Sequence, residues 1–310
     1  MAEAIERVVR VGPDERLVGV VTLPQAPRAG APGLLLMNAG VIHRIGPHRF
    51  NVKLARAVAG DGITSIRIDL SGLGDSPNAT SASHFGEQTI RDLQAAMDHL
   101  ERHHGIHRFI VYGLCSGAVN GYRLALADER IAGLLMFDGF VYPTWKTHIV
   151  RRLVRFRALP WSALARKPLQ WLRKERSPER APELGENADD AHLGVPTRAA
   201  FAQAMETLVA RGTSVYLVYS GSFLELHNYA GQLRDAFRRA PFLDRIRYDF
   251  MPDVDHTVTT QASQRKVLAA IRDWIQSVPV DASARMGTTL ASASDAGSTG
   301  RSIHESLSPP

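Results

Sequence analysis

The single cysteine of this 310-residue chain lies at the centre of the motif Gly113-Leu-Cys-Ser-Gly117, between an apolar run and a helical pattern. Gly-x-nucleophile-x-Gly between a strand and a helix is typical of a nucleophile elbow, a tight turn around which flanking side chains would collide. The turn places the Cys115 sulfur at a helix N-terminus, where backbone N–H groups and the helix dipole favour the thiolate. The motif therefore predicts that Cys115 is a nucleophile.

Two alternatives to this interpretation exist. If Ser116 were the nucleophile, Leu114 would occupy a position that the elbow reserves for glycine. A free cysteine is also often only a small, buried core residue. The paired glycines and the strand–turn–helix context favour a functional Cys115 over both.

A nucleophile of this type needs a general base and an acid that orients the base. His256 follows the last expected strand, where the chain order nucleophile, acid, histidine places the base. Asp138 ends the strand expected next to the elbow strand, and Glu225 lies in the loop after strand 213–219. We favour Asp138, although an aspartate that only caps the following segment is an equal alternative.

An oxyanion hole requires two backbone N–H groups directed at the developing negative charge. One is expected from Ser116, directly after the nucleophile. The other is expected from Gly40 or Val41, in the loop after strand 33–37, where glycine lets the backbone approach a substrate. The same loop continues as the basic segment 42–49, which is suited to a carboxylate or phosphate, with a solvated loop as the alternative. The candidate substrate-binding residues are Asn38, His43, Arg44 and Trp145.

No metal or cofactor is expected. One cysteine excludes an intramolecular disulfide and a cysteine-cluster zinc site. His103, His104 and His107 resemble a metal site in spacing, but they lie at a helix end before a strand. Polar and cationic groups there cap the last carbonyl groups of a helix, so we interpret the three histidines as a surface cap.

The elements that must position these residues alternate between strands and helices. Hydrophobic residues make up 45% of the chain, enough for a large core. Short apolar runs and amphipathic stretches of 10–20 residues predict βαβ units and a mainly parallel sheet, with a hairpin over 5–23 at its edge. Strands are expected at 33–37, 63–70, 108–112, 131–137, 213–219 and 245–251, and helices at 47–60, 86–104, 116–127, 227–239 and 261–277.

The sequence predicts a core in two parts, 1–138 and 196–280. A segment rich in Arg, Trp and Pro, residues 139–195, interrupts the alternation and is expected to form a helical lid over the sheet. Residues 281–310 are rich in Ser, Ala, Gly and Thr without any period, so we expect a disordered tail. The N-terminus lacks a signal-peptide pattern and no apolar stretch is long enough to span a membrane, so we expect a cytoplasmic protein.

With these motifs the chain resembles an α/β-hydrolase over roughly 5–138 and 196–277. The segments 38–49, 67–76, 113–118 and 255–257 resemble those of exosortase-associated hydrolases, which are relatives of the serine-aminopeptidase-like group. The resemblance implies that Asp75 is structural. A similar strand in certain haloalkane dehalogenases carries the triad acid at the position of Asp138.

The cysteine departs from the serine that most members of this fold carry. Cysteine elbows occur in dienelactone hydrolases and in polyhydroxyalkanoate synthases, which act on a lactone and on acyl-CoA thioesters. The resemblance therefore implies a mechanism without fixing a substrate.

The net charge of +6 is concentrated in one part of the expected lid. Residues 146–180 contain eleven Lys and Arg against two Glu, a net charge of +9, so the remainder carries −3. An amphipathic lid helix that buries its apolar stripe on an acyl pocket is the simplest interpretation. The alternatives are docking of an acidic acyl-carrier protein or CoA, and contact with an anionic membrane surface. No motif indicates nucleic-acid binding.

Together these features predict a cysteine-dependent acyl-transfer enzyme, a thioesterase or acyltransferase, with the triad Cys115, His256 and Asp138. Its substrate is expected to be a thioester or ester on a carrier protein or CoA. The alternatives are an ester or lactone hydrolase of the dienelactone-hydrolase type and a non-catalytic accessory protein that keeps the fold.

Overall fold

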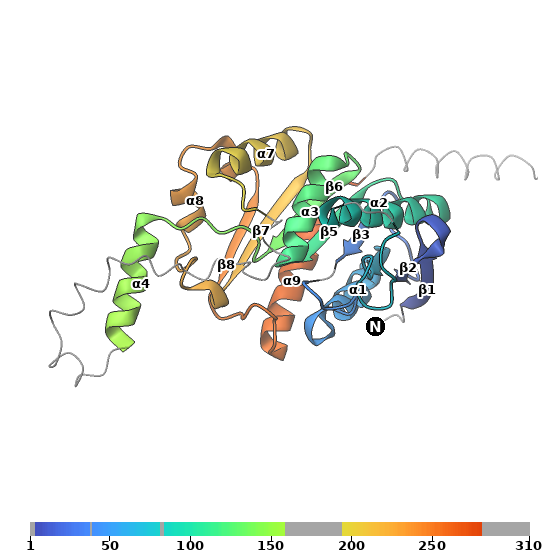
Figure 1. Ribbon diagram of the computed structural model, residues 1–310, viewed down its shortest axis with the longest axis horizontal. Helices are drawn as coiled ribbons and strands as arrows, with labels where there is room; N and C mark the ends of the chain where they lie inside the picture. Colours follow the sequence, from blue (N-terminus) through green and yellow to red (C-terminus); the bar gives the residue numbers. More distant parts are fainter. Residues whose placement is uncertain (1–3, 38, 81–83, 159–193, 281–310) are drawn as a thin grey trace, which may run out of the picture.

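The computed structural model describes residues 4–37, 39–80, 84–158 and 194–280, and within them eight strands form one sheet (Figure 1). The strand order is β1-β2-β4-β3-β5-β6-β7-β8. β1 and β2 form an antiparallel hairpin at one edge, β2 also pairs antiparallel with β4, and the pairs from β4 to β8 are parallel. The strands are β1 (Ile5–Val11), β2 (Leu17–Leu23), β3 (Gly33–Leu36), β4 (Ser65–Ile68), β5 (Phe109–Leu114), β6 (Ile131–Phe137), β7 (Ser214–Ser220) and β8 (Arg247–Met251).

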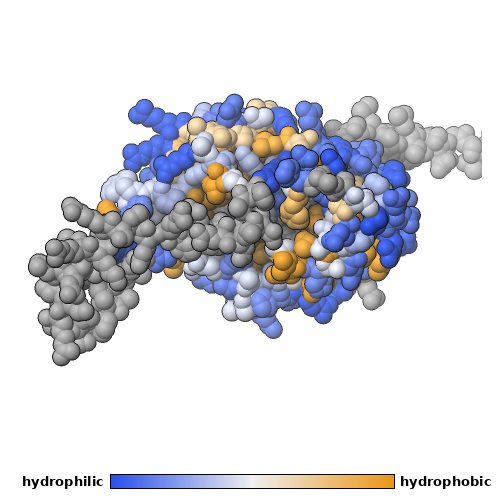
Figure 2. Space-filling view, viewed as in Figure 1, coloured by the Kyte–Doolittle hydropathy of each residue, from blue (hydrophilic) through white to orange (hydrophobic). Residues whose placement is uncertain are grey.

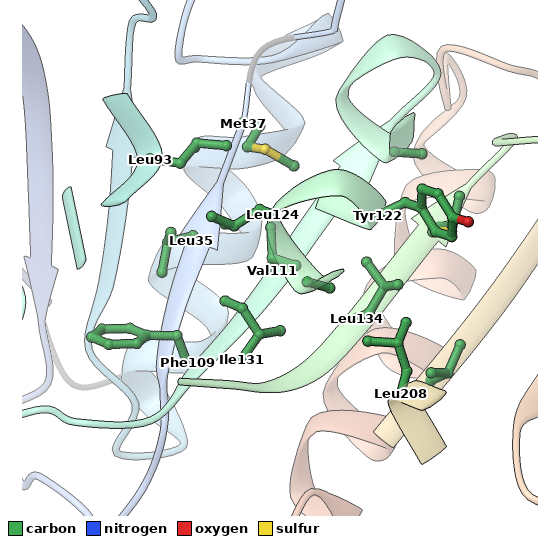
Figure 3. Close-up of a cluster of buried hydrophobic side chains, with 14 of the residues drawn as sticks. Leu35, Met37, Leu93, Phe109, Val111, Tyr122, Leu124, Ile131, Leu134 and Leu208 are labelled. Atoms are coloured by element: carbon green, nitrogen blue, oxygen red, sulfur yellow. The ribbon is translucent and has the colours of Figure 1, made fainter. Parts of the chain in front are cut away.

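Helices cover both faces of the sheet, which explains why the central strands are apolar runs without alternation. Every residue of β3, β5 and β6 is buried. On one face α1 and α9 share a core with the sheet, and on the other α2, α3 and α7 do so (Figure 3). The helices are α1 (Phe50–Gly60), α2 (Phe85–His104), α3 (Ser116–Ala127), α4 (Trp145–Ala158), α7 (Arg198–Ala210), α8 (Gln232–Ala236) and α9 (Gln261–Ser277).

The fold class predicted from the sequence is confirmed, and most of the expected elements are found with ends shifted by a few residues. The helix expected at 227–239 is much shorter, because only Gln232–Ala236 is helical and Arg239 adopts a positive φ of 67° before Pro241. The prediction also lacked α7. This helix begins after Thr197, whose side chain accepts a hydrogen bond from the Ala200 N–H group at 3.2 Å.

Of the expected lid, residues 139–195, the structure describes α4 and its flanks, whereas 159–193 and the expected tail 281–310 lie outside the described residues. Figure 1 shows α4 at the edge of the molecule, beyond α8. Its start is fixed to the segment after β7, because the Asn228 side chain donates to the Thr147 carbonyl at 3.0 Å. The residues Trp145, Ile149 and Leu153 are 61%, 45% and 57% exposed, so these three apolar side chains of α4 are not buried on a pocket.

The surface in the view of Figure 2 is mostly hydrophilic, with hydrophobic side chains in separate patches, one of them over α7. No helix in the described part of the chain is long and apolar enough to cross a membrane.

Candidate active site

Cys115 occupies a strained turn between β5 and α3. Its φ is 55° and its ψ is −119°, a conformation that is costly for any residue other than glycine. A Cβ atom on Gly113 would lie 2.1 Å from the Gly117 carbonyl oxygen, so the turn requires glycine there. The Cys115 N–H group donates to the Phe137 carbonyl oxygen at 2.9 Å, which ties the turn to the end of β6. The thiol is partly exposed at the N-terminal end of α3.

Asp138 lies directly after β6, at the same edge of the sheet as Cys115. Its side chain is buried, with 1% of the residue exposed. Oδ2 accepts a hydrogen bond from His256 Nδ1 at 2.8 Å and one from the Ser220 hydroxyl at 2.6 Å. Oδ1 accepts one from the Ser220 N–H group at 2.7 Å. Three hydrogen bonds to one buried carboxylate hold it in place.

His256 lies in the loop after β8, and its backbone N–H group donates to the Ser222 hydroxyl at 2.6 Å. Burial lowers the pKa of its imidazole, but the hydrogen bonds with Asp138 and the Cys115 side chain, and the charges of both groups, raise this pKa to about 9. The imidazole is therefore charged at neutral pH and lies between the Asp138 carboxylate and the Cys115 side chain.

Glu225, the alternative acid, lies elsewhere. Its side chain is 56% exposed and pairs with Arg151 of α4 at 3.6 Å. The structure thus brings Cys115, His256 and Asp138 together and places Glu225 against the start of the lid.

The loop after β3 approaches the elbow through Gly40. Gly40 adopts a φ of 54°, and its N–H group donates to the Ser116 hydroxyl at 2.7 Å. The N–H group expected to hold an oxyanion is therefore occupied by a side chain in this state of the protein. Val41 is 85% exposed, and Asn38 lies outside the described residues.

Arg44 has partners that differ from those predicted for it. Its guanidinium pairs with the buried Asp69 and with Asp75 at 2.7 Å, and its backbone N–H group donates to Asp69 Oδ1 at 2.6 Å. Two carboxylates already neutralise this cation, so it anchors its loop and is not open to a substrate anion. His43 is exposed in the same loop. Trp145 is exposed at the start of α4, with the Lys146 ammonium 5.9 Å from its ring centre.

Sequence reasoning missed Ser220 and Ser222. Both lie at or after the end of β7, which is the parallel neighbour of β6. The carboxyl ends of parallel strands meet at one edge of the sheet, so polar residues there were the available signal. The contact itself depends on how far each strand extends, and the pattern does not specify that.

In the part of the chain that the structure describes, no group of three His, Cys, Asp or Glu residues is arranged to hold a metal ion. The rings of His99 and His103 lie 4.5 Å apart, centre to centre, and are tilted by 44°, and His107 pairs with Glu101 at 3.0 Å.

The model of one protein family, serine aminopeptidase S33, matches residues 40–259, which include the elbow, Asp138 and His256. The chain belongs to this family. Its structure is similar to the esterase Pf2001 from Pyrococcus furiosus, with a TM-score of 0.57, 12% identity, and coverage of 89% of this chain and 92% of the esterase. It is also similar to XC6422 from Xanthomonas campestris, described as an α/β serine hydrolase without a lid, with a TM-score of 0.51, 14% identity, and coverage of 91% and 98%.

At such low identities the structural similarity shows a shared fold alone. No curated protein matches the chain. The family name refers to serine, whereas the elbow of this chain carries cysteine. The specific relation to exosortase-associated hydrolases stays a prediction.

Proposed function

We propose that this protein is a cysteine-dependent acyl-transfer enzyme that acts on an ester or thioester through an acyl-enzyme on Cys115. The observation that carries the proposal is the short chain of contacts from the buried Asp138 to the His256 imidazole and on to the Cys115 side chain. A strained nucleophile, a charged histidine and a fixed carboxylate together supply what nucleophilic catalysis requires.

In the first half-reaction the Cys115 sulfur attacks the acyl carbonyl carbon, and the carbonyl electron pair moves onto the oxygen. The Ser116 and Gly40 N–H groups are the proposed oxyanion hole, which requires that the Ser116 hydroxyl give up its hydrogen bond with Gly40. When the tetrahedral intermediate collapses, the bond to the leaving group breaks and the His256 imidazolium gives its proton to that alcohol or thiol.

In the second half-reaction the neutral His256 removes a proton from water or another acceptor, which attacks the acyl-enzyme. The carbon–sulfur bond breaks, the thiolate is released and the imidazolium re-forms. Asp138 keeps Nδ1 of the imidazole protonated through both steps, so the other ring nitrogen exchanges the proton. Water as acceptor gives a thioesterase or esterase, and an alcohol or amine gives an acyltransferase.

Two substrate classes follow from this site. A thiolate exchanges readily with a thioester because both the attacking and the leaving atoms are sulfur. An oxygen ester or lactone is the second candidate, since an esterase shares the fold. Activity on both can be compared directly with p-nitrophenyl acetate and acetyl-CoA.

The proposal of an acidic acyl-carrier protein or CoA as partner depends on the basic residues of the lid. In its described part, Lys146 pairs with Asp235 at 2.8 Å and Arg151 pairs with Glu225. Most of the other basic positions lie in 159–193, outside the described residues. Charge reversal at Arg151, Arg152 and Arg155 should weaken activity on carrier-bound donors more than on a short free thioester, whereas equal loss would indicate a packing defect.

The deciding experiment is intact-mass measurement after a short incubation with p-nitrophenyl acetate or acetyl-CoA. Because the chain has one cysteine, an acetyl adduct that iodoacetamide treatment prevents can be assigned to Cys115. Cys115→Ala should show no adduct, and Cys115→Ser should react more slowly. An adduct that persists in Cys115→Ala would remove the nucleophile hypothesis, and no adduct with any donor would favour a non-catalytic accessory protein.

A further inference from the structure

The strand β1 forms an open edge of the sheet. Within the described residues it pairs with β2 on one side, and no strand lies on its other side. Its sequence contains no proline or lysine, and its register with β2 runs from Ile5 to Val11 without a shift, so no bulge bends it. Proteins usually protect an edge with such devices, because free backbone N–H and C=O groups there pair with other strands. Figure 1 shows β1 at the end of the molecule opposite to α4.

The side chains of β1 distinguish it from β8, the strand at the other edge of the sheet. Val8 is 75% exposed and Ile5 is 48% exposed. By contrast, every residue of β8 is at least partly buried. Exposed β-branched side chains on an unprotected edge are typical of a surface that another strand covers.

The hydrogen bonds of β2 show which backbone groups of β1 are directed at it. The Asp69 N–H group donates to the Val18 carbonyl oxygen at 2.9 Å, so Val18 directs its backbone groups toward β4. Residues along an antiparallel strand alternate in this direction, so Val21 directs its backbone groups the other way, toward β1. Val21 faces Arg7 there. Arg7 and every second residue from it therefore use their N–H and C=O groups on β2.

The alternate residues of β1 direct their backbone groups away from the sheet. These are Glu6, Val8 and Arg10, and because side chains repeat every two residues, all three side chains lie on one face. Their order is acid, apolar, base. An antiparallel partner with the same sequence, aligned so that Val8 faces Val8, places Glu6 of each strand opposite Arg10 of the other. Each of these facing pairs exchanges two backbone hydrogen bonds.

We propose that β1 is an interface at which a second copy of this chain pairs antiparallel, around a two-fold axis at Val8, so that one sheet continues through both copies. Two-fold registers centred on Glu6, Arg7 or Arg10 would place like charges directly opposite each other, which is unfavourable. The register centred on Val8 pairs the whole strand and covers the exposed valine with its own copy. The interface is then self-complementary, as a two-fold dimer requires.

The charged groups of this face are available for the pairing. Arg56 Nη2 and Arg67 Nη2 donate to the Glu6 carboxylate at 2.5 Å and 2.8 Å, which holds the carboxylate in place. Arg10 is exposed. On the other face Ile5 lies opposite Val11 of the second copy. Cys115 follows β5, which three strands separate from β1, so this proposal is independent of the proposed catalysis.

The test is multi-angle light scattering of the full chain from low nanomolar to about 100 μM. The wild-type mass should rise to twice that of one chain. Val8→Glu and Val8→Lys each place two like charges at the two-fold axis, so each should raise the dissociation constant about tenfold or more. An equal mixture of the two variants should dimerise again, because a carboxylate then faces an ammonium group. Val195→Glu is the matched control, since Val195 is 59% exposed and outside the strands, and it should dimerise like the wild type.

Circular dichroism of each variant checks that the monomer is folded, as the exposure of Val8 leads us to expect. If the Val8 variants do not fold, Arg10→Glu takes their place, because it puts a second carboxylate opposite Glu6 at both ends of the interface and should weaken the dimer similarly. A wild type that stays monomeric overturns the proposal and leaves the edge to another occupant. Equal behaviour of Val8→Glu and Val195→Glu, or a mixture no tighter than its components, overturns it as well.

Discussion

Replacing Ser220 with alanine tests whether the buried carboxylate of Asp138 acts through its position. The Ser220 hydroxyl donates to Asp138 Oδ2 at 2.6 Å, and the same oxygen accepts the His256 Nδ1–H group at 2.8 Å. In Ser220→Ala, Asp138 Oδ2 keeps only the hydrogen bond from the His256 imidazole, while the hydrogen bond from the backbone N–H group of residue 220 to Oδ1 remains. The carboxylate can then rotate, and the imidazole loses its fixed orientation toward Cys115.

The size of the effect follows from the burial of the carboxylate. A hydrogen bond to a buried charged group contributes about 1.5–3 kcal/mol. If all of it serves to position His256 in the transition state, kcat/KM falls about 10- to 150-fold. Any part of this free energy that stabilises the folded state appears instead as a lower Tm, and if all of it does so the decrease is roughly 3 to 10 °C.

The assay is kcat/KM for p-nitrophenyl acetate together with thermal unfolding of the same samples. Ser71→Ala is the matched control, because Ser71 binds the buried Asp92 in the same way, with its N–H group at 2.7 Å and its hydroxyl at 3.1 Å. Both variants should lose stability, and only Ser220→Ala should lose activity. In an Asp138→Asn background the Ser220 effect should shrink to less than about threefold. Full activity in Ser220→Ala, or an undiminished loss in that background, would refute the positioning role.

Two further predictions concern the same site. The raised pKa of His256 means that its acidic proton is present at neutral pH and is lost as the pH rises through about 9, so kcat/KM should fall there. Asp138→Asn removes the strongest interaction that raises this pKa, so the alkaline limb of the pH–rate profile should move to lower pH; an unmoved limb would assign it to another group. Ser116→Ala frees the Gly40 N–H group from its 2.7 Å bond and should raise kcat/KM about 2- to 10-fold on the same ester. A decrease would show instead that the hydroxyl assists the reaction.

The elements that position the site were predictable because their signals are local. The apolar runs of β3, β5 and β6 and the glycines of the elbow are sequence patterns with a direct steric or burial cause. α7 was missed although Phe201, Met205 and Leu208 have helical spacing. This pattern begins directly after the Arg- and Pro-rich insertion. The change of composition placed the expected boundary there, and no helix was predicted before the next strand.

The contacts of the site depend on long-range geometry, which a residue pattern does not contain. The sequence left both Asp138 and Glu225 as candidates for the triad acid. Only the positions of the ends of β6 and β7 decide which of the two side chains reaches His256. The same holds for Arg44, whose basic neighbours suggested an anion site. Instead Arg44 is bound by Asp69, which lies 25 positions further along the chain. No sequence pattern around either residue indicates this contact.

The contact between Arg44 and Asp69 gives the last prediction. Asp69 is fully buried, and its carboxylate binds both the guanidinium and the backbone N–H group of Arg44. Arg44→Met leaves this charge without its cation, which should reduce the free energy of unfolding by about 3–5 kcal/mol. His43→Ala, an exposed neighbour in the same loop, should change it by no more than about 0.5 kcal/mol. Urea denaturation measures both, and adding Asp69→Asn to Arg44→Met should restore part of the loss, because no unpaired charge then remains. Equal midpoints for the two single variants would mean that the Arg44–Asp69 pair does not stabilise the folded protein.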